Sequence, residues 1–377
     1  MIPGPTTVSP RVLNAMSNPI ISHRGEGFGK ILTQTSELMS ELFRTDNTSL
    51  ILSGSGTSAM EAAIANVVNP HEKIINVSGG KFGERLAEIS QIHELDSLEL
   101  KVDWNDVVDP KILKEMLDEN EDVKAVTLIH NETSTGTRSP LKKVGKLMKN
   151  YDALLIVDTV SSFAGDYVEV DKYGIDVCFT GSQKCIAAPP GVVAITLSDD
   201  AWKVAETVNS HTYYLNLIKA KQKAESNPMQ TPYTPAISSI YGFLEALKII
   251  DEDGLENVIK RHIKAASASR NAAKSLGFEL FVKNEEIASN TVTTLKIPDG
   301  ASAKGIRKTM IDDYQVEIAG GQDWLKGKII RIGHMGNISY KELAVTYTAL
   351  GATLKKLGLD VDEAAGVAEI AKEYVKV

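Results

Sequence analysis

Short apolar runs, separated by polar and glycine-containing turns, recur through the first 250 residues. Their length predicts strands, and runs that are apolar throughout rather than alternating are typical of parallel strands buried on both faces. Helical spacing of apolar residues between the runs predicts crossover helices. We therefore expect an α/β fold with a mainly parallel sheet sandwiched by helices, which binds ligands at the carboxyl ends of its strands. The strands are predicted at 49–52, 73–77, 123–129, 153–157, 176–180 and 192–196, and helices at 30–44 and 57–68.

The pattern changes near residue 250, where a smaller α+β unit is predicted to begin. The first fourteen residues contain three prolines and no periodicity, so they are expected to be extended. The length of 377 residues fits about two domains. We divide the chain into an N-terminal arm (1–14), a large domain (15–250) and a small C-terminal domain (251–377). The predicted elements of the last unit are helices at 255–276, 303–312 and about 343–354, and strands at 291–297, 315–318 and 328–332.

The composition and charge of the chain are typical of a globular protein and exclude several other classes. Hydrophobic residues make up 43% and charged residues 24%, which is typical of a globular protein and excludes collagen-like, low-complexity and coiled-coil chains. No apolar run reaches the ~20 residues of a membrane helix, and the N-terminus lacks the features of a signal peptide. A net charge of −8 argues against a nucleic-acid partner. Two cysteines are too few for a disulfide framework, so we expect a cytoplasmic protein.

A glycine-rich turn joins the first predicted strand to the following helix, with the sequence Ser53-Gly54-Ser55-Gly56-Thr57-Ser58-Ala59. Free amides at a helix start, together with the helix dipole, favour an anion. The spacing also fits a dinucleotide fingerprint, but that motif needs an acidic residue at the end of the next strand, where Ser78-Gly79-Gly80 stands. A small phosphate fits better, and a plain tight turn is the structural alternative.

Asp158 and Lys184 each follow an apolar strand. The aspartate could simply cap a helix, and a lysine is usually a surface residue. Lys184, however, is surrounded by small residues and prolines, and burial would lower its pKa, as an imine-forming amine requires. The pair, with a phosphate turn upstream, suggests pyridoxal phosphate, with the aspartate holding the pyridine nitrogen protonated. We expect no metal.

Four motifs at residues 53–59, 130–136, 158–162 and 181–184 resemble those of fold-type I pyridoxal-phosphate enzymes. More narrowly, the chain resembles prokaryotic and archaeal class V aminotransferases of the alanine–glyoxylate and serine–pyruvate family, from residue 3 to residue 333. The resemblance implies transfer of an amino group from a small amino acid (alanine, serine, aspartate or phosphoserine) to a 2-oxo acid such as glyoxylate, pyruvate or 2-oxoglutarate. A broad-specificity aspartate or phosphoserine enzyme is the alternative.

The resemblance also implies a role for individual residues. Lys184 would form the Schiff base and transfer a proton, and Asp158 would pair with the pyridine nitrogen. Phe82, where the family often has tryptophan, would stack on the ring, and Val160 would pack on its other face. Thr133 would lie near the phenolic oxygen of the cofactor. The phosphate would be bound by Ser55, Gly56, Thr57 and Gln183.

Substrate binding is implied for Arg331, Gly4 and Arg24. Arg331 lies in a run of isoleucines, where a bidentate pair with the substrate α-carboxylate explains a guanidinium. Arg24 could receive a distal carboxylate or phosphate, or be a surface residue. The family sends the segment at 230–234 into the phosphate site of a partner subunit, which implies a homodimer with a shared active site. Animal enzymes carry tyrosine in place of Gln230, so the contact is left open among Gln230, Thr231, Tyr233 and Thr234.

Three other functions are weighed against transamination. A cysteine desulfurase needs a mobile loop cysteine, but Cys178 lies in a predicted strand and Cys185 directly follows Lys184. An NAD-dependent dehydrogenase would use the Gly54 turn. A non-catalytic binding protein would not need Lys184, Asp158 and Arg331 together.

Overall fold

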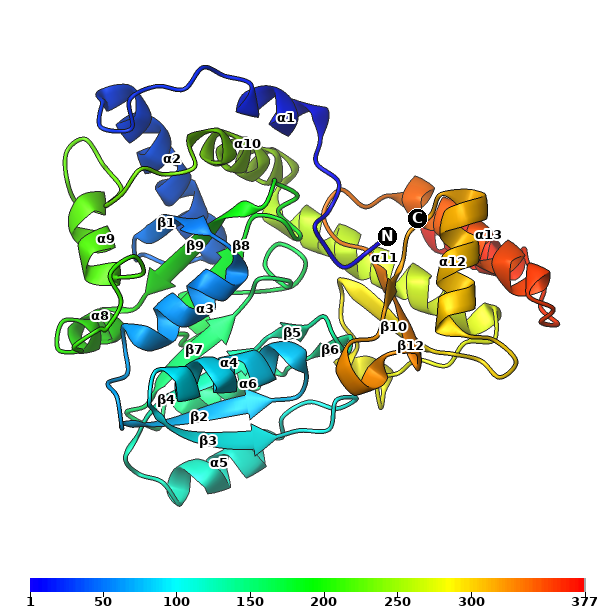
Figure 1. Cartoon of the computed structure of the whole chain (residues 1–377), viewed down its shortest axis with the longest axis horizontal. Helices are drawn as coiled ribbons and strands as arrows, with labels where there is room; N and C mark the ends of the chain where they lie inside the picture. The colour runs from blue at the N-terminus through cyan, green and yellow to red at the C-terminus, as the bar shows by residue number, and fades with distance from the viewer. Residues whose placement is uncertain (376–377) are drawn as a thin grey trace.

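The computed structural model describes residues 1–375, and within this range a seven-stranded sheet forms the centre of the larger part of the molecule (Figure 1). Strand β9 is antiparallel to both of its neighbours, and the other strand pairs are parallel. The sheet is therefore mainly parallel, as predicted, with one reversed strand and with β3 as a strand that the sequence pattern did not indicate. In spatial order the strands are β1 (Ser49–Gly54), β9 (Gly191–Leu197), β8 (Val177–Gly181), β7 (Leu154–Asp158), β4 (Val123–Ile129), β2 (Lys73–Ser78) and β3 (Asp96–Lys101).

Helices cover both faces of this sheet, because neighbouring strand residues point to opposite sides. Ile75 and Leu155 lie in one apolar core, and the preceding residues Ile74 and Leu154 lie in the other. This explains why the strands are apolar throughout instead of alternating. The first core is covered by α2 (Glu26–Phe43), α5 (Pro110–Asp118), α6 (Leu141–Met148), α7 (Val170–Tyr173) and α10 (Ile237–Asp253), and the second by α3 (Gly56–Ala65), α4 (Lys81–Ile92), α8 (Asp199–Ala205) and α9 (Leu217–Ala224).

The C-terminal part packs its own helices on a small antiparallel sheet and has a separate apolar core (Figure 1). Gly254 ends α10, and α11 begins at the next residue. The division of the chain near residue 250 stays a prediction. The elements are strands β10 (Val292–Lys296), β11 (Ala319–Gly320) and β12 (Ile329–Gly333), and helices α11 (Leu255–Ser275), α12 (Ala303–Tyr314), α13 (Tyr340–Lys356) and α14 (Ala365–Val375).

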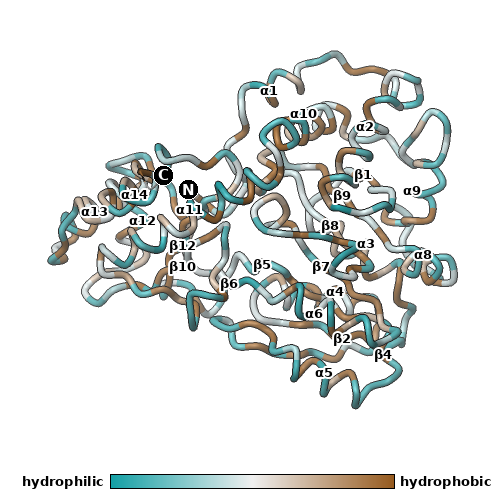
Figure 2. The backbone as a smooth tube through the Cα atoms, turned by 180° about the vertical axis from the view of Figure 1, so that it is seen from behind, coloured by the Kyte–Doolittle hydropathy of each residue, from teal (hydrophilic) through white to brown (hydrophobic). Residues whose placement is uncertain are grey.

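Hydrophilic and hydrophobic residues alternate along the outer helices (Figure 2). Buried hydrophobic residues of these helices form part of the apolar cores. In α2, for example, Phe28, Leu32 and Met39 are buried. Among residues 1–375, no helix combines the length and the apolar character needed to cross a bilayer.

Two local predictions are wrong. Residues Pro10–Met16 form helix α1 rather than extended chain, because Ser9 accepts a hydrogen bond from the Val12 amide and Pro10 occupies the first helical position. Residues 315–318 are not a strand, because Gln315 has φ +56° and ends α12 in the left-handed conformation. The strand there is the shorter β11. Helix α14 was not predicted at all.

Candidate active site

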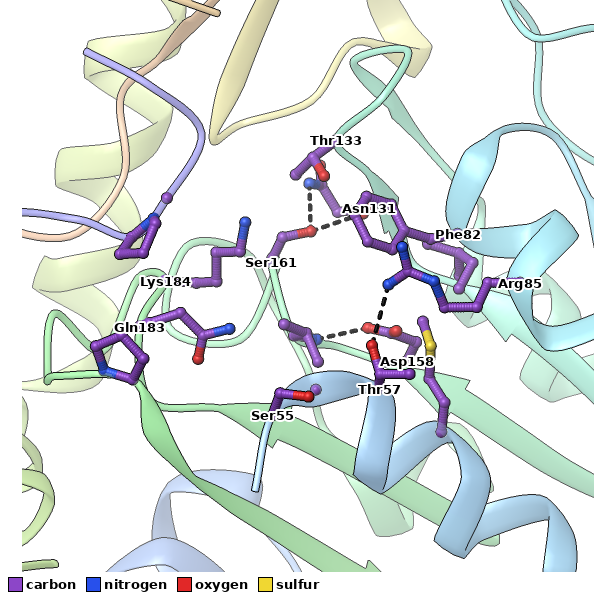
Figure 3. Close-up of a pocket in the computed structure, with 17 residues that line it drawn as sticks. Ser55, Thr57, Phe82, Arg85, Asn131, Thr133, Asp158, Ser161, Gln183 and Lys184 are labelled. Atoms are coloured by element: carbon purple, nitrogen blue, oxygen red, sulfur yellow. Dashed lines mark hydrogen bonds between the residues drawn. The ribbon is translucent and has the colours of Figure 1, made fainter. Parts of the chain in front are cut away.

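The carboxyl ends of β1, β4, β7 and β8 meet at a cavity of about 300 Å³ (Figure 3). This is where an open α/β sheet binds its ligands, since the loops that follow the parallel strands leave a crevice there. Most of the residues that sequence reasoning selected line this one cavity. They are Gly4, Ser55, Gly56, Thr57, Phe82, Thr133, Asp158, Val160, Gln183 and Lys184.

Asp158 ends β7 and is buried, with 5% of its surface exposed. The Val160 amide donates to its Oδ1 at 2.7 Å. Burial raises the pKa of Asp158 to about 7. Because a buried carboxylate is stabilised by a nearby cation, this side chain favours a protonated, positively charged group in the cavity.

Lys184 enters the same cavity from the loop after β8 (Figure 3). Burial lowers the pKa of its amine to about 8, so about a tenth of it is unprotonated at pH 7, far more than for an exposed lysine. The amine donates to the Pro3 carbonyl, and Thr6 donates to the Lys184 carbonyl at 2.9 Å. Gly4, with φ +90°, lies so close that a Cβ there would be 2.7 Å from Lys184 Cδ. The N-terminal segment thus packs directly on the lysine.

The turn before α3 leaves hydrogen-bond donors free at the cavity. Ser55 is the N-cap residue, and the amides of Gly56 and Thr57 have no preceding helical turn to supply an acceptor. Gln183 Oε1 is buried and has no hydrogen-bond partner in the described part of the chain. The two free amides, beside an amine and a carboxylate, fit a phosphorylated ring compound.

Sequence reasoning gave no role to several residues in or beside this site, of which two make contacts with predicted site residues. Arg85 lies one turn after Phe82 on α4, with its guanidinium 4.7 Å from the centre of the Phe82 ring, and donates to Thr57 Oγ1 at 3.1 Å (Figure 3). Arg85 could have been found from the sequence, because a residue three positions after Phe82 lies on the same face of a helix. Glu132 is buried, does not line this cavity, and accepts hydrogen bonds from the amides of Phe82 and Gly83. It lies in the motif at 130–136 but was assigned no role.

A second cavity of about 430 Å³ shares Gly4, Phe82, Thr133 and Lys184 with the first. Arg331 on β12 lines it and is only 6% exposed. Its Nε donates to the Gly320 carbonyl at 2.8 Å, and its Nη1 donates to the Thr133 carbonyl at 2.7 Å. Burial lowers the pKa of Arg331 to about 10, so the guanidinium is still charged at neutral pH.

Arg24 and the segment at 230–234 do not line either cavity of this chain. Arg24 instead donates to Gln230 Oε1 at 3.0 Å and to the carbonyls of Thr231 and Pro232 at 2.5 and 3.1 Å. Arg24, Gln230, Thr231 and Thr234 therefore act at a site only if they reach that of another subunit. Their roles stay predictions.

The cysteines do not have the environment of a nucleophile. Cys178 and Cys185 are buried, and burial raises the pKa of each thiol to about 12. A thiolate is the reactive form. The geometry therefore gives no support to the desulfurase alternative.

The chain matches the family model of class-V aminotransferases over residues 4–338, and it belongs to this family. It is 46% identical over 376 residues to an uncharacterized aminotransferase of Methanocaldococcus jannaschii, covering 100% of this chain and 97% of the relative. It is 32% identical to a serine–glyoxylate aminotransferase of Methylorubrum extorquens, covering 100% and 95%. The crystal structure of the ureidoglycine–glyoxylate aminotransferase of Bacillus subtilis superimposes with a TM-score of 0.95 at 29% identity, covering 99% and 97%.

The enzyme is therefore a pyridoxal-phosphate-dependent aminotransferase of fold type I, because this family uses that cofactor. The match favours the predicted aminotransferase over the dehydrogenase alternative. The free amides after Ser55 would fit the phosphate of the cofactor, Asp158 its ring nitrogen and Lys184 its aldehyde.

Proposed function

We propose that this enzyme transfers the amino group of a small amino acid to glyoxylate or a similar 2-oxo acid, such as pyruvate or 2-oxoglutarate. One observation carries the proposal: the Lys184 amine and the Asp158 carboxylate line one cavity, and that cavity adjoins the one lined by Arg331. Two relatives described above are named for glyoxylate, which supports this acceptor. Alanine, serine, aspartate and phosphoserine are the candidate donors.

The residues of the first cavity would hold the cofactor in a fixed orientation. Asp158 would pair with the ring nitrogen, and Thr133 would lie near the phenolic oxygen. Phe82 and Val160 would pack on the ring. When bound, pyridoxal phosphate withdraws electrons from the bonds at the substrate Cα. The phosphate would be bound by Ser55, Gly56, Thr57 and Gln183, which line the cavity, with the amides of Gly56 and Thr57 as free donors.

Lys184 would hold and move the proton at the substrate Cα. A base works best when its pKa is near the working pH, and burial brings the pKa of Lys184 to about 8. Arg331 would fix the α-carboxylate through its outer guanidinium edge, because its Nε and Nη1 are already held by Gly320 and Thr133. Gly4 would border the substrate on the side of the N-terminal segment.

We infer further that the enzyme works as a homodimer with shared active sites. Tyr213 and Tyr214 are 73% and 56% exposed and pack on Tyr233, next to the segment that the family sends to the partner. Exposed aromatic side chains that gather in one place mark an interaction surface. A cytoplasmic location fits the two unpaired cysteines.

Half-reactions with single donors test the proposal. The purified enzyme, loaded with pyridoxal phosphate, is mixed with alanine, serine, aspartate or phosphoserine, and the visible absorbance of the cofactor is followed. At least one donor should bleach it, and glyoxylate should restore it. The Lys184→Ala variant should show neither change at a comparable rate. No bleaching with any donor, or equal rates in the variant, would reject the proposal.

A further inference from the structure

Arg307 is a second arginine that lines the 430 Å³ cavity beside Arg331. It comes from α12, whereas Arg331 comes from β12. No residue between 1 and 375 forms an ion pair with Arg307, whose Nε donates a hydrogen bond to the Ile318 carbonyl at 3.0 Å. An arginine whose terminal nitrogens have no acidic partner, at the rim of a substrate cavity, is available to bind an anion.

The two arginine side chains are both held by backbone carbonyls at or next to the short strand β11. Arg331 Nε donates to the Gly320 carbonyl, and Arg307 Nη1 is 3.1 Å from where a Cβ on Gly320 would be. The carbonyls that hold the two side chains, those of Ile318 and Gly320, are two residues apart, which corresponds to roughly 7 Å along extended chain. Two cations anchored at neighbouring points of one cavity wall suit a ligand with two acid groups.

The charges around the cavity favour a doubly negative ligand. Arg307, Arg331 and Lys184 line it, and Glu317 is the acidic residue on its wall among the described residues. Glu317 and Arg307 are both exposed, so solvent screens both charges, and the cations on the wall still outnumber the acid. Gly320 leaves room for the Arg307 guanidinium, because a Cβ there would be in tight contact with Arg307 Nη1 at 3.1 Å.

We infer that Arg307 binds the distal carboxylate of a dicarboxylic amino donor, such as aspartate or glutamate, while Arg331 holds the α-carboxylate. The inference rests on the proposed function and gives it a substrate class. It also differs from the prediction for Arg24, which is engaged with Gln230, Thr231 and Pro232. Arg307 is the cation that this chain itself supplies to the cavity for a second acid group.

Binding of non-reacting acids tests the inference without turnover. Succinate and propionate, which differ by one carboxylate, are titrated into the holoenzyme and the cofactor-free protein by calorimetry. The wild type should bind succinate at least about tenfold more tightly than propionate. Arg307→Met should abolish most of that preference, and Arg331→Gln should weaken the binding of both acids. Lys304→Met is the matched control, because Lys304 is exposed on the same helix and lines neither cavity.

Kinetics give a second readout. The ratio of kcat/KM for aspartate to that for alanine should fall about tenfold or more in Arg307→Met and stay unchanged in Lys304→Met. An unchanged succinate preference in Arg307→Met, or its loss in Arg24→Ala instead, would overturn the inference. If no donor reacts at all, the proposed function fails, while the succinate and propionate affinities still judge Arg307 separately.

Discussion

The buried carboxylate of Glu132 accepts a hydrogen bond from the backbone amide of Phe82 at 3.0 Å. It accepts another from the Gly83 amide at 3.2 Å, and its second oxygen accepts from the amide and hydroxyl of Ser134. A negative charge is thus placed at the start of α4, where the free amides and the helix dipole favour it. The next residue, Thr133, accepts the hydrogen bond that holds Arg331. Glu132 therefore connects the predicted ring-stacking residue with the predicted carboxylate-binding residue.

Replacing Glu132 should disturb the position of Phe82 against the cofactor ring and, through Thr133, that of Arg331. Glu132→Ala leaves four donors of the buried network without an acceptor, which should lower the free energy of unfolding by about 2–4 kcal/mol. The affinity for pyridoxal phosphate should fall about tenfold, and Glu132→Gln should recover part of the loss. Urea unfolding and fluorescence titration with the cofactor measure these effects. Glu88→Gln, on the exposed side of α4, is the control. Unchanged cofactor affinity in Glu132→Ala would show that the network does not position Phe82.

Asp158 should make the stability of the cofactor-free protein depend on pH. Its pKa is about 7 in the folded chain, above the ordinary 3.8. Between these values the folded state binds more protons than the unfolded state, so stability falls as pH rises from about 4 to 7. Each unit of pKa difference between the folded and unfolded states corresponds to about 1.4 kcal/mol in the free energy of unfolding. The wild type should therefore lose a few kcal/mol relative to Asp158→Asn over this range, measured by urea unfolding. Parallel curves for the two proteins would contradict the expectation.

Lys184 should be the residue that pyridoxal phosphate modifies. Because burial lowers its pKa to about 8, its amine should react in preference to exposed lysines, and the extent of reaction should rise as pH is raised through 8. Treatment with borohydride makes the bond permanent, and peptide mass mapping locates it. The label should lie on the peptide containing Lys184 and be absent from the same peptide in Lys184→Ala. Labelling spread over many lysines in the wild type would refute the assignment.

The sequence predicted the layers of the fold and the cofactor cavity better than the substrate cavity. Asp158 and Lys184 follow strongly apolar strands, so topology alone brings them to one edge of the sheet. Arg307 lies on an amphipathic helix with ordinary solvent-facing spacing, and only the packing of that helix against β11 brings it to the cavity. Helix α1 was missed because the prolines that suggested extended chain include Pro10, which begins the helix. Arg24 depends on a second subunit, which no local pattern specifies.

Complementation between two inactive variants should show whether the site is shared. Lys184→Ala removes the amine from one cavity, and the triple variant Gln230→Ala, Thr231→Val, Thr234→Val should remove contacts to the cavity of a partner. If the site is shared, a mixed dimer contains one site with both lesions and one with neither. Random mixing of such two-fold dimers should then restore about a quarter of the wild-type activity.

The matched control for this experiment mixes Lys184→Ala with Asp158→Ala. Both of these residues line one cavity of the same chain, so every site of their mixed dimer keeps one lesion and no activity should return. Activity measured after denaturing and refolding the proteins together distinguishes the two mixtures. Recovery in neither mixture would place the segment at 230–234 outside the partner's site, and full activity of the triple variant alone would exclude these three side chains as the contact. Assaying Tyr233→Phe in the same way would then test the remaining candidate of that segment, whose hydroxyl donates to the Tyr213 carbonyl at 2.6 Å within its own chain.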